Sequence, residues 1–100
     1  MNYSNESNNK IVNIENIDLI TNGTIENLKS IDSNQIGMVK DNNNNIISEI
    51  TPLIMIINQN ASDMELRIET LVKNGADMDM KIKYYNKEVS ARDIYKLKNQ

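Results

Sequence analysis

The chain lacks several residue types on which catalysis and covalent stabilisation depend. Its 100 residues include no cysteine, which excludes disulfides, a thiol nucleophile and a cysteine-ligated zinc ion. They include no histidine, which removes the commonest metal ligand and the commonest general base near neutral pH. Tryptophan and phenylalanine are absent too, and the 3 glycines form no phosphate-binding loop. We therefore predict a binding protein that is not an enzyme and that holds no cofactor and no metal.

Long apolar runs are also missing. No stretch approaches the roughly 18 apolar residues that a membrane-spanning helix needs. The sequence does not open with a basic segment followed by an apolar one, as a secretory signal peptide would. On this basis we expect a cytoplasmic protein that makes no contact with membranes.

Asparagine, isoleucine and lysine dominate what is present. The sequence holds 18 Asn and 16 Ile, and its 9 Lys far outnumber its 2 Arg. All three residue types are encoded by AT-rich codons, so the bias is typical of a low-GC genome and lowers the significance of any single Asn. Hydrophobic residues still make up 39% of the chain, which is enough for one small folded domain.

The net charge of −3 conceals an uneven distribution. Residues 1–80 carry 5 basic and 12 acidic side chains, whereas residues 81–100 carry 6 basic and 2 acidic ones. A basic segment can bind the phosphates of nucleic acid, so nucleic-acid binding through residues 81–100 is the alternative function. The cations are spread along this segment rather than clustered, which favours an ordinary solvated surface.

Residues 51–60 carry the signals of a short helix. Thr51 is a typical N-cap, and Pro52 suits the first helical position because its missing N–H costs nothing there. Asn60 tolerates the left-handed conformation that ends a helix. The apolar residues between them recur at the spacing of one helix face, which leaves Met55 on the outward, concave side. That apolar face consists of Leu53, Ile56 and Ile57.

Two more helix starts follow in the second half of the chain. Ser62 with Glu65, and Ser90 with Asp93, have the spacing of a capping box. Gly75 suits the left-handed residue that ends the first of these helices. Their apolar faces would consist of Met64, Ile68, Leu71 and Val72, and of Ile94 and Leu97. In total we predict helices at 15–22, 24–32, 52–59, 63–74 and 91–98, with residues 76–89 as a projecting loop or hairpin.

Parts of this pattern resemble the ankyrin repeat. Thr51-Pro52-Leu53 is similar to the start of a repeat, and Gly75-Ala76-Asp77 is similar to the end of its second helix. Ser90-Ala91-Arg92-Asp93-Ile94 resembles the start of a terminal repeat. The distance from Thr51 to Ser90 exceeds the family's period of about 33 residues, but the extra residues fall in surface turns where insertion is tolerated. Residues 19–29 resemble, more weakly, the helix–turn–helix junction of a preceding repeat.

The resemblance implies an all-α fold, a short ankyrin-like solenoid of helical hairpins with projecting loops or β-hairpin turns. Repeats are stabilised mainly by their neighbours, and about three are needed for a stable array. The chain therefore barely reaches that number, or is a fragment of a longer array with no independent function. Its segments would be a disordered tail at 1–9, a divergent N-terminal capping repeat at 10–45, an ankyrin-like repeat at 46–85 and a C-terminal half repeat at 86–100.

The resemblance also implies a function, which is non-catalytic recognition of another protein by the concave helix face and the hairpin tips. Ankyrin proteins of this composition look like those of large DNA viruses, low-GC bacteria and protists, many of which act on host proteins in the host cytoplasm. We expect the chain to be a monomer. Carried over by position, the protein-binding residues would be Met55, Asn58, Gln59, Tyr84 and Tyr85.

Asp77 and Asp79 are close enough in sequence to suggest a cation site. They lack the spaced carboxylates and the glycine of an EF-hand loop. The ankyrin resemblance instead implies that Asp77 accepts backbone hydrogen bonds in the hairpin region, so no metal site is predicted.

Overall fold

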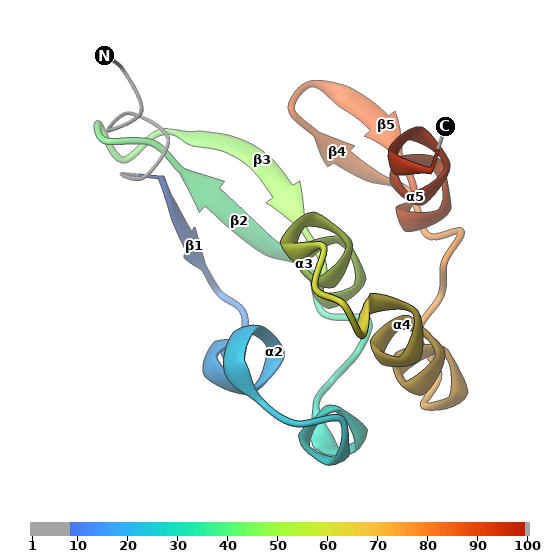
Figure 1. The fold of residues 1–100 in the computed structure, drawn as a ribbon. Helices are drawn as coiled ribbons and strands as arrows, with labels where there is room; N and C mark the ends of the chain where they lie inside the picture. The colour runs from blue at the N-terminus through green and yellow to red at the C-terminus, as the bar shows by residue number, and fades with distance from the viewer. Residues whose placement is uncertain (1–8, 100) are drawn as a thin grey trace.

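The computed structural model describes residues 9–99, in which helical pairs alternate with β-hairpins (Figure 1). Apart from Asn9, the tail predicted at residues 1–9 lies outside the described residues. In chain order the elements are β1 (Lys10–Val12), α2 (Ile17–Asn22), the 3-10 helix η1 (Glu26–Ser30), β2 (Gly37–Lys40), β3 (Ile46–Ile50), α3 (Pro52–Gln59), α4 (Met64–Lys73), β4 (Ile82–Tyr84), β5 (Lys87–Val89) and α5 (Ala91–Lys98).

The predicted all-α fold is wrong, because the protein is mixed α/β. One antiparallel sheet has the strand order β1-β2-β3, and a second sheet consists of the β4–β5 hairpin. Strands β2 and β3 alternate buried residues with more exposed ones, which is the two-residue period of a half-buried strand. At four and five residues they are too short for that alternation to stand out in the sequence.

The segment Asp41–Asn45, an aspartate followed by four asparagines, forms the turn between β2 and β3. The Asp41 side chain accepts hydrogen bonds from the backbone N–H groups of Asn45 (3.0 Å) and Asn43 (2.9 Å). The N–H of Asn45, together with that of Asn43, holds the pKa of the Asp41 carboxyl below its ordinary value. Asn44 adopts a positive φ of 69°, a conformation that asparagine tolerates better than most residues. The segment therefore forms the turn of a β-hairpin.

Helix α3 lies at the centre of the fold, in contact with α2, α4 and α5 (Figure 1). It begins as predicted, with the Thr51 hydroxyl accepting a hydrogen bond from the N–H of Ile54 and with Pro52 in the first turn. Asn60 ends it in the left-handed conformation. Every residue from Pro52 to Ile57 is buried, so the helix has no outward apolar side. A helix that is apolar all round is typical of a fully enclosed position.

Helix α4 matches the predicted span closely but begins differently. Asp63 is its N-cap, with no side-chain cap hydrogen bond, and its carboxylate instead pairs with Arg67 Nε at 2.9 Å. The capping box predicted for Ser62 and Glu65 is therefore wrong. Gly75 follows the helix with a φ of 104°, as predicted for a left-handed residue. On the predicted apolar face Met64, Ile68 and Leu71 are buried, whereas Val72 is exposed.

Helix α5 has the predicted bounds and the predicted start. The Ser90 hydroxyl accepts from the N–H of Asp93, and the Asp93 carboxylate accepts from the N–H of Ser90, which completes a capping box. Ile94 is buried, but Leu97 is 66% exposed and does not join the core. The apolar face predicted for this helix is therefore only half correct.

The first helical pair is shorter than predicted. Helix α2 covers most of 15–22, and the second segment forms the 3-10 helix η1 rather than an α-helix over 24–32. Ile20 and Leu28 are fully buried where α2 packs against α3 and η1 packs against α4. None of the helices within residues 9–99 is long and apolar enough to cross a membrane.

Side-chain amides connect the first helical pair to the second. Gln59 Nε2 donates to the carbonyl of Thr21 at 2.7 Å, and Asn74 Nδ2 donates to the carbonyl of Lys29 at 2.5 Å. The Asn34 amide both donates to the carbonyl of Gly75 (2.8 Å) and accepts from the N–H of Asp77 (2.9 Å). These bonds satisfy backbone groups at or just beyond the helix ends, where such groups have no hydrogen-bond partner within the helix.

We expect Leu71→Ala to destabilise the protein by about 2–5 kcal/mol, because Leu71 is 0% exposed and its removal leaves a cavity between the helical pairs. Chemical denaturation followed by circular dichroism measures this loss. The neighbouring Val72→Ala is the control and should cost under about 1 kcal/mol. Equal effects of the two substitutions would contradict the packing described.

Candidate functional site

A groove of about 480 Å³ opens between the three-stranded sheet, the end of α3 and the β4–β5 hairpin. Its floor is apolar, and Ile11, Val39 and Ile50 provide one side chain from each strand of the sheet. Ile11 lies directly opposite Val39 in the antiparallel register, so both point to the same face. Among residues 9–99, none of the side chains that line the groove is charged. The remaining lining residues are Asn9, Asn58, Tyr84 and Tyr85.

Two tyrosines of the β4–β5 hairpin form one wall of this groove. The Tyr84 and Tyr85 rings meet edge to face, with centroids 4.8 Å apart. Tyr84 packs partly against the core, whereas Tyr85 is 46% exposed. Tyr85 and Asn86 both have positive φ values (48° and 72°), as a two-residue turn twisted to match the strands requires. The turn therefore presents the Tyr85 ring at the tip of the hairpin.

Asn58, near the end of α3, fixes the position of Tyr84. Its Nδ2 donates a hydrogen bond of 3.0 Å to the Tyr84 hydroxyl. The bond connects the central helix to the hairpin across 26 positions of sequence. It leaves the carbonyl oxygen of the Asn58 amide as a hydrogen-bond acceptor at the groove.

Side chains of β3 hold the hairpin beside the larger sheet. Glu49 Oε1 accepts from the N–H of Lys83 at 2.7 Å, and Ser48 Oγ accepts from the N–H of Tyr85 at 3.1 Å. Strands β3 and β4 lie side by side, yet they belong to separate sheets. Two side-chain acceptors, rather than a continuous ladder of backbone hydrogen bonds, therefore join the hairpin to β3.

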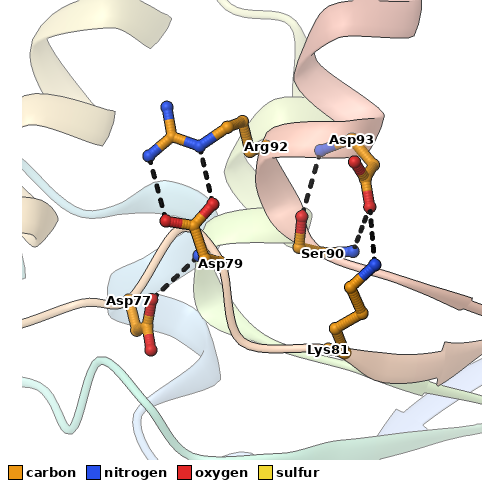
Figure 2. Close-up of polar contacts among 6 residues, drawn as sticks. All are labelled: Asp77, Asp79, Lys81, Ser90, Arg92 and Asp93. Atoms are coloured by element: carbon orange, nitrogen blue, oxygen red, sulfur yellow. Dashed lines mark hydrogen bonds and ion pairs between the residues drawn. The ribbon is translucent and has the colours of Figure 1, made fainter.

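An ion pair secures the segment that leads into the hairpin (Figure 2). The Arg92 guanidinium of α5 contacts the Asp79 carboxylate through two bonds, Nε to Oδ1 at 2.7 Å and Nη2 to Oδ2 at 3.3 Å. Asp77 Oδ1 accepts from the N–H of Asp79 at 2.8 Å, which is the backbone bonding predicted for Asp77. Within residues 9–99 no group of three acidic side chains converges as a metal site would require.

A second polar contact lies on the other side of the α5 N-terminus (Figure 2). Lys81 Nζ lies 3.8 Å from the Asp93 carboxylate, which also closes the capping box with Ser90. Hydrogen bonds from Ser90 lower the pKa of Asp93 below its ordinary value. The hydrogen bond from Arg92 lowers the pKa of Asp79 in the same way. Both carboxylates are thus held in their charged form.

The predicted site residues separate into two groups. Asn58, Tyr84 and Tyr85 meet at the groove. Gln59 instead bonds to the carbonyl of Thr21 between the helical pairs. Met55 is only 4% exposed, so the expectation that it faces outward is wrong. The reason is that α3 is enclosed on every side, which a one-faced helix pattern does not predict.

Sequence reasoning missed the apolar floor of the groove. Ile11, Val39 and Ile50 come from three short strands, in segments for which no helix or strand was predicted. The available signal was the turn-forming Asp41–Asn45 segment between two short stretches with β-branched residues, 37–40 and 46–50.

Comparison of the chain with protein-family models, with curated proteins and with solved structures finds no match. The resemblance to ankyrin repeats therefore stays a prediction that depends on the quoted motifs alone.

The ion pairs of this region predict a loss of stability in acid. A carboxylate whose pKa is lower in the folded state stabilises that state above its unfolded pKa and loses the contribution as the pH falls through its folded pKa. For Asp79 and Asp93 that loss begins near the ordinary value of 3.8. The melting temperature should therefore fall as the pH is lowered below about 4. It should fall less steeply in Asp79→Asn/Asp93→Asn. If the melting temperature of that variant depended on pH as steeply as that of the parent, Asp79 and Asp93 would not be the source of the loss.

Proposed function

We propose that the chain is a non-catalytic protein-recognition module, and that its groove binds an extended, uncharged segment of another protein. The observation that carries this proposal is the groove itself, with its apolar floor from three strands and its tyrosine wall. Tyrosines supply large contact areas at modest ordering cost and are enriched at the energetic centres of protein interfaces.

The side chains that line the groove indicate which kind of protein segment would bind there. Because no charged side chain of the described residues lines the groove, a charged group placed there would lose its hydration without gaining a partner among them. The floor suits an apolar side chain. The Asn58 carbonyl oxygen suits a backbone N–H of the same segment. We therefore propose a segment with an apolar residue flanked by ordinary backbone, in the strand-like conformation that exposes such groups.

The order of the elements supports the same proposal. After strand β1, a helical pair, a hairpin, a second pair, a second hairpin and a last helix follow one another along the chain. In the ankyrin family, which the sequence resembles, the concave helix face and the hairpin tips recognise other proteins. The groove combines both features, since Asn58 belongs to α3 and Tyr85 lies at a hairpin tip. The lack of cysteine and histidine in the sequence supports a role without catalysis.

Nucleic-acid binding through residues 81–100 is the competing function. Two of its cations have acidic partners, since Arg92 pairs with Asp79 and Lys81 lies beside Asp93. These pairs reduce the positive charge that the segment offers to a phosphate backbone. The contacts therefore favour protein recognition over nucleic-acid binding.

Removal of the Tyr85 ring should weaken binding by about 2 kcal/mol or more. Tyr85→Asn is the suitable change, because asparagine accepts the positive φ of the turn. Peptides selected against the folded protein from a random phage-displayed library serve as the probe, and titration calorimetry measures affinity. Circular dichroism should report an unchanged melting temperature.

Lys96→Gln/Lys98→Gln is the matched control and should leave peptide affinity unchanged, because both lysines lie in the last turn of α5, outside the groove. The same variants are titrated with a fluorescent DNA duplex at low and moderate salt. If the lysine pair abolishes tight DNA binding while Tyr85→Asn leaves peptide affinity intact, the protein-recognition proposal is wrong.

A further inference from the structure

The chain enters the three-stranded sheet at the edge of the groove. Asn9, the first described residue, lines the groove, and β1 begins at the next position with Lys10. Ile11, two positions further on, forms part of the groove floor. The eight residues that precede Asn9 in the sequence are therefore attached directly to the groove.

This preceding segment is long enough to reach the groove floor. Six positions separate Tyr3 from Asn9, and a chain of that length spans at most about 20 Å when it is extended. Residues 4–8 are Ser, Asn, Glu, Ser and Asn. Serine and asparagine are frequent in turns, because their side chains bond to nearby backbone groups. A turn within residues 5–8 would bring Tyr3 back over the floor beside Asn9.

The side chains of the segment match those that line the groove. Residues 1–5 carry no charged side chain, and Tyr3 supplies an aromatic ring between two small polar residues. This is the chemistry that the uncharged lining requires of an occupant. Glu6 is the one charged side chain of residues 1–8, and it lies about 10 Å from Tyr3 along an extended chain. Glu6 therefore stays in water when the Tyr3 ring contacts the floor.

The wall of the groove suits a further tyrosine. Aromatic rings pack favourably edge to face, as Tyr84 and Tyr85 do with their centroids 4.8 Å apart. The ring of Tyr3 would extend this arrangement across the floor. Its hydroxyl would donate to the amide oxygen of Asn58, whose Nδ2 is bonded to Tyr84.

We infer that residues 1–5 occupy the groove of their own chain, with the Tyr3 ring on the apolar floor. The inference rests on the proposed function, because the segment competes there with the partner protein. Covalent attachment favours the segment, since a short connection gives it an effective concentration in the millimolar range. A contact too weak to form between separate molecules therefore still lowers the affinity for a partner.

Amide NMR spectra of the full chain test this occupancy without any partner. Tyr3→Ser should shift the backbone signals of Ile50 and Asn58, which line the groove but are distant from residue 3 in sequence. The signal of Leu71, which is buried elsewhere, should not move. Tyr3→Phe is the matched control, and because it keeps the ring it should retain the parent pattern at the groove.

Peptide affinity measures the competition. Tyr3→Ser should raise the affinity of the full chain for the library-selected peptide about threefold or more, because the peptide no longer has to displace the ring. Tyr3→Phe should bind the peptide as the parent does. Circular dichroism of the three proteins confirms that each is folded.

The results separate this inference from the proposed function. Groove signals that stay in place in Tyr3→Ser would overturn the inference, even where Tyr85→Asn weakens peptide binding. An unchanged peptide affinity of Tyr3→Ser would do the same. Shifts that grow with protein concentration would mean that the segment of a second copy occupies the groove, and the contact within one chain would be wrong. Shifted groove signals in a protein for which the library yields no peptide would support the inference and refute the proposed function.

Discussion

The complete burial of helix α3 is the constraint on which the other elements depend. Its apolar residues cover the whole circumference of the helix, so each side needs its own cover. Helices α2, α4 and α5 pack around it, and the β3 strand leads directly into its first turn. The polar end of the same helix carries Asn58 and Gln59. One of these reaches the groove and the other reaches the first helical pair, so the position of α3 determines the position of both.

The groove is formed by two separate sheets that differ in how they are stabilised. Its floor belongs to a three-stranded antiparallel sheet, in which the β2–β3 register shifts between Val39 and Lys40. Its wall belongs to a separate two-stranded hairpin, and short isolated hairpins are marginally stable in water. The hairpin is held by the buried Ile82 side chain, by polar bonds to Glu49, Ser48 and Asn58, and by the Asp79–Arg92 pair at its base. Recognition surfaces commonly combine a rigid base with an adjustable edge in this way.

Local signals predicted the helices well where a cap and an apolar spacing agreed. Thr51-Pro52 and Ser90 with Asp93 each determine a helix start by direct backbone bonding, so the bounds of α3 and α5 follow from adjacent residues. Asp63 shows the limit of this approach, because its bond to Arg67 replaced the capping box expected one residue earlier. The side of α3 on which Met55 lies depends on elements distant in sequence. The strands of the groove floor depend on pairing over similar distances, which no single segment encodes.

The amide contacts between the two helical pairs have a consequence for how the molecule comes apart. Gln59, Asn74 and Asn34 bind through neutral groups, which neither acid nor salt alters within ordinary ranges. The attachment of the β4–β5 hairpin to α5 uses charged groups instead, which respond to both. The contacts between the helical pairs and the contacts of the β4–β5 hairpin should therefore be lost under different conditions of pH and salt. Below about pH 4 the charged attachment of the hairpin should weaken first, while the amide contacts between the helical pairs remain.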